Sequence, residues 1–312
     1  MHTKQQIRFL LSSAGVKPNK RLGQHFLIDL NLMRLLIDSA GISKNDVVLE
    51  VGCATGSLTG ALAGKAGFCV AVEIDAVLAG IAKSQLADKQ NVEIINADVL
   101  ENKFEINPVV VDALNRGRAV HKGRLLLVSN LPYVAATPIM LNLITGKIVA
   151  DAMFVTVQKE VANRMAAHPG TKDYGTLSIL LSATGDIRHI RTLKPTVFWP
   201  QPQVDSAIIS YVRNAEKLKA IKNIEMLGKI VGAFLRHRRK MLKGCCKLMT
   251  GERSTGFQPV QARPGLSRVK SREWPCYDWL DIFSRCGIDP TIRPDQLTPE
   301  QFVAIANLCS ES

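Results

Sequence analysis

The residues Asn130, Leu131, Pro132 and Tyr133 directly follow an apolar run, residues 125–128, that is typical of a buried strand. A strand that ends in a carboxamide, a proline and an aromatic ring offers hydrogen-bond acceptors and a stacking face to a flat ring that carries an amine. Adenine methylation needs such a site, because the amine becomes nucleophilic only when its hydrogens are accepted and its nitrogen can re-hybridise. Taken alone, the tetrapeptide is more often a proline-stiffened turn after a strand.

A glycine-containing turn follows the first expected strand, where residues 52–56 read Gly-x-Ala-x-Gly. Glycine lets the backbone approach a ligand closely at the carboxyl edge of a parallel sheet, where open α/β folds bind their ligands. The spacing differs from the Gly-x-Gly-x-x-Gly fingerprint of dinucleotide sites. The turn therefore disfavours a nicotinamide cofactor and favours S-adenosylmethionine.

Two acidic residues mark the ends of the next two expected strands. Glu73 is placed to accept hydrogen bonds from both ribose hydroxyls of a donor, and Asp98 from the amine of the donor's adenine. Taken singly, each acid is more often a helix N-cap or a solvated carboxylate. Together with Gly52, at the ends of three successive strands, they predict a methyl-donor site.

Composition points to a nucleic-acid partner. The 312 residues carry a net charge of +13, and a basic surface attracts phosphate backbones through counterion release. A solvated basic surface without a ligand is the alternative. We expect no membrane association, because the chain lacks a long apolar span or a basic amphipathic N-terminus. The seven cysteines form no C-x-x-C pair, so we expect reduced thiols, a cytoplasmic location and no metal.

The hydrophobic pattern predicts an α/β fold with a doubly wound, mostly parallel sheet. Expected strands are residues 47–51, 68–72, 92–95, 125–128 and 153–157, with helices at 57–65, 76–86 and 138–145. Two later runs, 187–193 and 207–212, fit an antiparallel edge. Because Pro108, Gly117 and Gly123 interrupt the stretch 104–124, we expect a long surface excursion there.

The length indicates two domains. We expect residues 1–213 to form an S-adenosylmethionine-binding domain that begins with a helical segment. Residues 214–312 should form a small all-helical RNA-binding domain, with helices at 224–248, 277–286 and 299–308. Its stretch 250–275 is rich in Gly, Pro, Ser and Arg, which predicts a mobile insert.

Six segments together resemble the ribosomal RNA adenine dimethyltransferase family, in particular its bacterial small-subunit members. They are residues 20–27, the Gly52 turn, Glu73 with Asp98, residues 130–138, residues 158–175 and residues 197–207. Weaker likeness at 234–241 and 287–306 extends the match over nearly the whole chain. The resemblance implies a Rossmann-like class I methyltransferase sheet with a small C-terminal helical domain.

The resemblance also implies roles for individual residues. The donor would contact His25, Leu27, Gly52, Glu73, Asp98 and Asn130. The catalytic set would be Asn130, Leu131, Pro132, Tyr133 and Phe198, with Tyr133 stacking on a flipped adenine and Phe198 as the opposing face. Asn130 and the Leu131 carbonyl would accept the amine hydrogens during direct in-line transfer. In this chain Cys53 and Ala54 replace the usual Pro-Gly, so Ala54 brings a methyl group to a point of close approach.

Basic side chains supply candidate RNA contacts. They are Lys20 and Arg21 near the donor site, and Arg236, Arg238, Arg239, Lys240 and Lys243 on the helix expected at 224–248. Without the resemblance, such a run is as often only a solvated helix face. The insert also carries a small positive charge, which makes it a further candidate for RNA contact or a functionless insertion.

The resemblance implies methylation of two adjacent adenosines in a hairpin near the 3' end of small-subunit rRNA, during maturation of the 30S particle. We expect the chain to act on a pre-30S particle as a monomer. One alternative is a large-subunit rRNA adenine methylase of the macrolide-resistance type, which shares the donor site. Another is a ribosome-assembly factor with weak or lost methylation, which the methyl group of Ala54 keeps open.

Overall fold

The computed structural model describes residues 1–19, 22–250 and 277–311. Lys20, Arg21 and residues 251–275 of the expected insert therefore lie outside the described residues. The chain divides into a first unit, Met1–Ala166 with Thr184–Ala215, and a second unit, Ala167–Ala183 with Glu216–Ser312. The domain boundary expected after residue 213 stays a prediction, and residues 167–183, expected in the first domain, cluster with the second unit.

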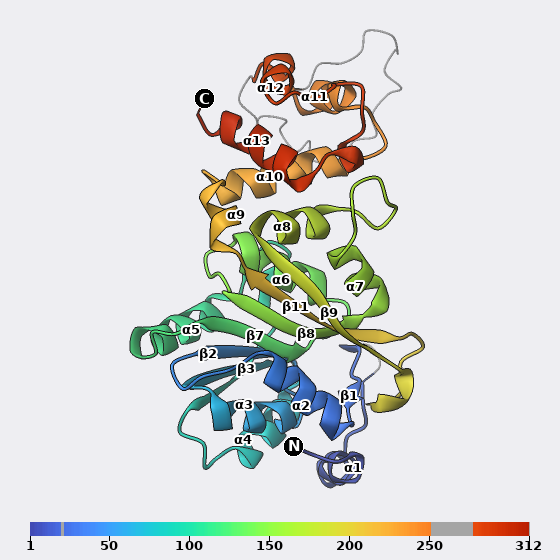
Figure 1. Cartoon of the computed structure of the whole chain (residues 1–312). Helices are drawn as coiled ribbons and strands as arrows, with labels where there is room; N and C mark the ends of the chain where they lie inside the picture. The colour runs from blue at the N-terminus through green and yellow to red at the C-terminus, as the bar shows by residue number, and fades with distance from the viewer. Residues whose placement is uncertain (20–21, 251–276, 312) are drawn as a thin grey trace, which may run out of the picture. The chain divides into compact units, whose positions relative to one another are not determined.

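A seven-stranded sheet forms the centre of the first unit, in the order β4-β3-β2-β7-β8-β11-β9 (Figure 1). The strands are β2 Val47–Val51, β3 Phe68–Glu73, β4 Val92–Asn96, β7 Leu125–Asn130, β8 Ala152–Gln158, β9 Gly185–Leu193 and β11 Ser206–Arg213. The strands from β4 to β8 run parallel, whereas β11 is antiparallel to β8 and to β9. The predicted mostly parallel sheet with an antiparallel edge is thus confirmed.

Among its described residues, the first unit also contains seven α-helices and four short strands. The helices are α1 Lys4–Ser13, α2 Leu30–Ser39, α3 Ser57–Lys65, α4 Ala76–Gln85, α5 Pro108–Val120, α6 Ala136–Thr145 and α7 Lys159–Met165. The strand β1 Phe26–Leu27 pairs with β10 Phe198–Trp199, and β5 Leu100–Asn102 pairs with β6 Glu105–Ile106. Apolar side chains of α2 and α3 pack in one core with those of β2, β7, β8 and β11.

The surface excursion expected at 104–124 is wrong, because α5 occupies most of it. Pro108 stands in the first turn of α5, where its missing N–H costs nothing, and the Asn107 side chain accepts from the amide of Val109. Gly117 is a packing residue, since a Cβ there would lie 2.6 Å from Cδ1 of Phe68 in β3. Both residues look like helix breakers in the sequence, yet here they start the helix and let it approach the sheet.

All elements of the second unit are helical among its described residues. They are α8 Thr176–Thr184, α9 Ala215–Lys219, α10 Ile224–Arg236, α11 Leu242–Thr250, α12 Trp279–Arg285 and α13 Pro299–Cys309, with α8 and α9 each reaching one residue into the first unit. Phe234 of α10 meets Trp279 of α12 edge-on, with ring centroids 5.4 Å apart. The single helix expected at 224–248 is wrong: α10 ends at Arg236, and the Lys240 amide donates to the His237 carbonyl in the turn before α11.

Residues 167–183 associate with the second unit through specific hydrogen bonds. The Gly170 amide donates to the Asp295 carbonyl at 2.7 Å, and the buried Tyr174 hydroxyl donates to the Leu297 carbonyl at 2.9 Å. No helix of the described residues is long and apolar enough to cross a membrane.

Candidate active site

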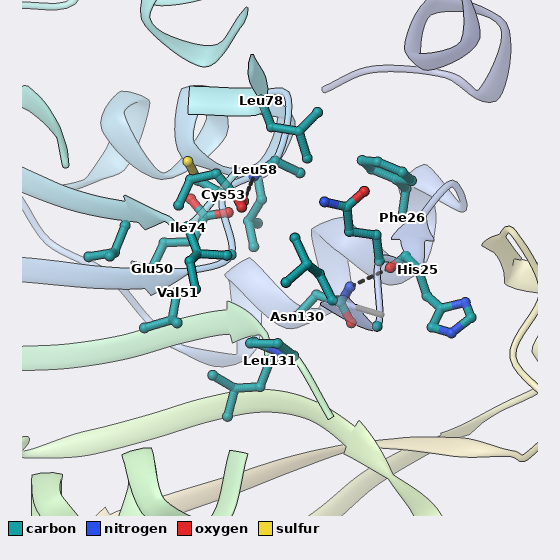
Figure 2. A pocket seen from close by; sticks show the side chains of 18 of the residues that line it. His25, Phe26, Glu50, Val51, Cys53, Leu58, Ile74, Leu78, Asn130 and Leu131 are labelled. Atoms are coloured by element: carbon teal, nitrogen blue, oxygen red, sulfur yellow. Dashed lines mark hydrogen bonds between the residues drawn. The ribbon is translucent and has the colours of Figure 1, made fainter. Parts of the chain in front are cut away.

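A cavity of about 300 Å³ lies in the first unit, at the carboxyl ends of the parallel strands (Figure 2). This volume is at the lower end of the range for small-molecule sites. Nine of the predicted site residues line it: His25, Leu27, Gly52, Glu73, Asp98, Asn130, Leu131, Pro132 and Tyr133. The parallel sheet brings these residues together because the turns after successive strands open at the same edge.

The turn between β2 and α3 forms one wall of the cavity with an unusual backbone. Gly52 and Gly56 have φ angles of +79° and +77°, and Ala54 between them has a φ of +52°. Ala54 is the single non-glycine residue with positive φ among the described residues. A Cβ in this left-handed region costs about 1 kcal/mol. Ala54 therefore adopts a conformation suited to the glycine that the resemblance leads us to expect there.

Glu73 holds this turn in place. Its Oε2 accepts from the Ala54 amide at 2.9 Å and its Oε1 accepts from the Asp75 amide at 3.0 Å. Burial raises the pKa of the Glu73 carboxyl, although these two hydrogen bonds act in the opposite direction. Each carboxylate oxygen retains a second lone pair, so the residue can still accept from a hydroxyl in the cavity.

Asp98 follows β4 and is exposed at the cavity rim. Its Oδ1 accepts from the Leu100 amide at 2.9 Å, which fixes the side chain at the start of β5. An exposed carboxylate held in this way can accept a further hydrogen bond from an amine at the rim.

Glu50 is a cavity residue that we did not single out from the sequence. It is 3% exposed, and its Oε2 accepts from the Thr59 hydroxyl at 2.6 Å. Burial raises the pKa of its carboxyl to about 8, so the folded protein holds it protonated at neutral pH. The sequence did contain a signal for Glu50, because it is an acidic residue within the apolar run 47–51. A buried carboxyl group is expected only where it has hydrogen-bond partners or a function.

Asn130 ends β7 with its amide oriented by a neighbour. Its Nδ2 donates to the backbone carbonyl of His25 at 2.9 Å, shown as the dashed line between these residues in Figure 2. Its Oδ1 is buried and has no hydrogen-bond partner among the residues that the structure describes. A buried acceptor without a partner is costly, so its position at the cavity indicates a donor group supplied by a ligand.

Tyr133 is held at its ring and at its hydroxyl. The hydroxyl lies 2.8 Å from Oγ of Ser206, and the ring stacks on the imidazole of His25 with centroids 5.6 Å apart. Burial raises the pKa of the Tyr133 hydroxyl, which therefore remains protonated at neutral pH. The residue can offer a stacking face, and its protonated hydroxyl is not a general base at that pH.

Phe198 does not line the cavity, in contrast to the opposing stacking face that we expected. Its partner in the β1–β10 pair is Leu27, and both side chains belong to the core beneath the sheet, with Phe198 1% exposed. Strand alternation sends the next pair, Phe26 and Trp199, to the other side, where their rings stack at 6.0 Å. Pairing with β1 thus directs Phe198 into the core.

The N-terminal segment contributes a wall that the sequence did not indicate. Ile7 of α1 lines the cavity, and it packs with Phe26 and Leu78. The His2 amide donates to Oγ of Ser57 at 2.6 Å, and its ring nitrogen Nδ1 lies 3.1 Å from Oγ1 of Thr55. The sequence predicted a helical segment at the start of this domain but gave no sign of where it packs.

The predicted RNA-binding residues of the second unit differ in their surroundings. Arg236, Arg239, Lys240 and Lys243 are exposed. Arg238 instead donates to the Lys172 carbonyl at 3.2 Å and forms an ion pair with Asp295 at 3.1 Å. Arg238 therefore has a structural role in holding residues 167–183, whatever else it binds. Lys20 and Arg21 lie outside the described residues.

No group of three or more His, Cys, Asp or Glu side chains placed to hold a metal ion occurs in the described part of the chain. Cys53 lines the cavity, and burial raises the pKa of its thiol well above the ordinary value, which disfavours the thiolate.

Comparison with solved structures supports the fold. A dimethyladenosine transferase from Plasmodium falciparum superposes with a TM-score of 0.64, at 20% identity over 89% of this chain and 94% of that one. The 23S rRNA methyltransferase ErmE superposes with a TM-score of 0.56, at 21% identity over 91% of this chain and 99% of that one. The predicted class I methyltransferase fold is confirmed.

Comparison of sequences identifies the family. The chain is 38% identical to the ribosomal RNA small subunit methyltransferase A of Geobacillus thermodenitrificans, over 96% of this chain and 93% of the relative. It is 34% identical to the protein of the same name from Bacillus mycoides, over 98% and 96%. The profile of the ribosomal RNA adenine dimethylase family matches residues 15–263. The chain therefore belongs to the ribosomal RNA adenine dimethylase family.

Proposed function

We propose that this protein transfers methyl groups from S-adenosylmethionine to the 6-amino nitrogen of two adjacent adenosines near the 3' end of small-subunit rRNA. The proposal is carried by the buried Oδ1 of Asn130, an acceptor without a partner among the described residues, at a cavity that is also lined by the Gly52 turn. The curated relatives are named as small-subunit rRNA methyltransferases, which favours the small subunit over the large one.

The donor half of the cavity fits S-adenosylmethionine by the chemistry of its residues. Gly52 allows close backbone approach, Glu73 offers acceptors to ribose hydroxyls, and Asp98 offers one to an aromatic amine. The bound donor supplies an electrophilic methyl group on a sulfonium.

The acceptor half of the cavity would hold the adenine. Oδ1 of Asn130 would accept a hydrogen bond from the amine, with help from the Leu131 carbonyl, so that the nitrogen lone pair is available to attack the methyl carbon. The carbon–sulfur bond breaks as the nitrogen–carbon bond forms, S-adenosylhomocysteine leaves, and the amine proton passes to solvent. The Tyr133 ring provides the stacking face, and aromatic stacking contributes about 1 to 3 kcal/mol per base. Because the target must leave its own stack, this contact offsets part of that cost.

RNA would be held by exposed basic residues of the second unit, Arg236, Arg239, Lys240 and Lys243, with Lys20 and Arg21 as further candidates. Charge of this kind binds phosphates through counterion release. We further propose that the protein acts as a monomer in the cytoplasm on a pre-30S particle.

The test is methyl transfer from tritiated S-adenosylmethionine into small and large ribosomal subunits that lack the modification, followed by mapping of the labelled nucleotides. We expect incorporation into small subunits, approaching four methyl groups per particle, two on each of two adjacent adenosines. Label confined to large subunits would overturn the proposal in favour of the macrolide-resistance type of activity. Donor binding without any transfer would favour an assembly factor instead.

A further inference from the structure

His25 contacts both residues that are proposed to grip the base. Its backbone carbonyl accepts from Nδ2 of Asn130 at 2.9 Å. Its imidazole stacks on the Tyr133 ring, with centroids 5.6 Å apart and planes inclined by 26°. His25, which directly precedes β1, thus contacts both groups on the acceptor side of the cavity.

The imidazole of His25 is fixed by a third contact. Its Nδ1 lies 2.7 Å from the carbonyl oxygen of Pro200. A carbonyl oxygen only accepts, so Nδ1 carries the proton and donates it. This hydrogen bond sets the plane of the ring. Figure 2 shows the ring turned away from the part of the cavity that holds Glu50 and Cys53, which is the donor half.

The carbonyl of His25 selects the orientation of the Asn130 amide. With Nδ2 facing the carbonyl, Oδ1 is left free to accept. The flipped amide would place two oxygen atoms against each other and lose the hydrogen bond, which makes it the unfavourable state. The position of this backbone carbonyl therefore decides that Asn130 presents an acceptor to the adenine amine.

The ring of His25 also decides which face of Tyr133 a base can use. A centroid separation of 5.6 Å is that of two aromatic rings in direct contact, and it leaves no room for a base between them. The base must stack on the opposite face. Tyr133 is thereby held by His25 behind its ring and by Ser206 at its hydroxyl.

We propose that His25 is a positioning residue for the acceptor base, acting on Asn130 through its backbone carbonyl and on Tyr133 through its ring. The proposal rests on the proposed function, since it concerns the adenine that this site would methylate. It assigns to the His25 ring a role beyond the donor contact that the family resemblance implies.

Two variants separate the contacts. His25→Phe keeps a ring that can stack on Tyr133 but removes the hydrogen bond to Pro200, whereas His25→Ala removes both. His189→Ala is the matched control, because His189 is exposed on the edge strand β9 and its ring contacts only Thr192 among the hydrogen bonds described. Methyl transfer by the wild-type protein into small subunits is measured first. Absence of this transfer would show that the proposed function is wrong, independently of the role of His25.

For His25→Ala we expect the transfer rate at saturating donor and RNA to fall about tenfold. This change corresponds to about 1.4 kcal/mol, which is the size of one aromatic contact. The donor dissociation constant, measured by calorimetry, should stay within about twofold of wild type. His25→Phe should recover part of the lost rate, because stacking on Tyr133 is kept. His189→Ala should behave as wild type.

A tenfold weaker donor affinity with an unchanged rate at saturation would overturn the proposal and leave only the donor role. A parallel loss of donor affinity and rate in both variants, with a lowered melting temperature, would show a merely structural role and would also overturn it. An unchanged rate and affinity in His25→Ala would do the same.

Discussion

The backbone amide of Ala54 donates a hydrogen bond to Oε2 of Glu73 at 2.9 Å while Ala54 stands in the left-handed region with a φ of +52°. The carboxylate thus holds the turn in a shape that an alanine resists. Because Ala54 lines the cavity, its methyl group lies at the wall that is proposed to receive the donor. The left-handed conformation of Ala54 should therefore lower the stability of the folded protein by a measurable amount.

We expect Ala54→Gly to raise the free energy of unfolding by about 0.5 kcal/mol, because relief of left-handed strain outweighs the added entropy of the unfolded chain. We also expect tighter binding of S-adenosylmethionine. Urea unfolding and calorimetric titration measure the two effects. Ala97→Gly is the control, since Ala97 also lines the cavity but has no positive φ; equal gains in both variants would exclude strain as the cause.

Stability should depend on pH through Glu50. Burial raises the pKa of its carboxyl to about 8 in the folded protein, from an ordinary value of 4.5. The folded state therefore binds this proton more tightly than the unfolded state. Its contribution to stability is complete below pH 4.5 and is lost as the pH rises towards about 8.

Glu50→Gln keeps an oxygen that can accept from Thr59 but cannot ionise, so it should lose this decline and be the more stable protein above about pH 8. The measurement is urea unfolding across that pH range without donor. Glu101→Gln, at an exposed position of β5, should leave the decline in place. If the stability of Glu50→Gln declined with pH as steeply as that of the wild type, another group would be responsible for the decline.

Asn130→Ala should lower turnover by about 100-fold, as expected for removal of one hydrogen-bonding group that acts in the transition state. Donor affinity should change little, because the amide faces the His25 carbonyl and the acceptor side of the cavity. Single-turnover methyl transfer and calorimetry separate rate from binding. Asn31→Ala on α2 is an exposed control, and full turnover by Asn130→Ala would disprove the assigned role.

Arg238 and Arg239 are neighbours with different expected effects. Arg238→Ala should destabilise the second unit by about 1 kcal/mol, because it removes a partly exposed ion pair with Asp295 and hydrogen bonds to the carbonyls of Thr171 and Lys172. Arg239→Ala should instead leave stability unchanged and reduce the slope of log affinity for RNA against log salt by about 0.7 to 0.9. Unfolding curves and salt-dependent RNA binding distinguish the two; the same phenotype for both would contradict the division.

The sequence alone determined the sheet, the glycine turn and the residues at the carboxyl ends of its strands. The hydrophobic pattern predicted a strand at residues 47–51 and a helix at residues 57–65, and β2 Val47–Val51 and α3 Ser57–Lys65 have the same bounds in the structure. In a parallel sheet, the carboxyl ends of the strands lie at the same edge. Gly52, Glu73, Asp98 and Asn130, which are at or just after those ends, are therefore expected to lie close together. These placements depend on local pattern and on one topological rule.

Tertiary structure decided what local pattern could not. Gly117 looked like a breaker because its packing partner, Phe68, is distant in the chain. The resemblance implied that Phe198 is a stacking face, and only its pairing with Leu27 in β1 shows that its side chain enters the core. The orientation of the Asn130 amide likewise depends on the carbonyl of His25, which lies 105 positions away. Composition and spacing fix which groups are present, whereas the direction in which each side chain points is set by contacts between segments that are remote in sequence.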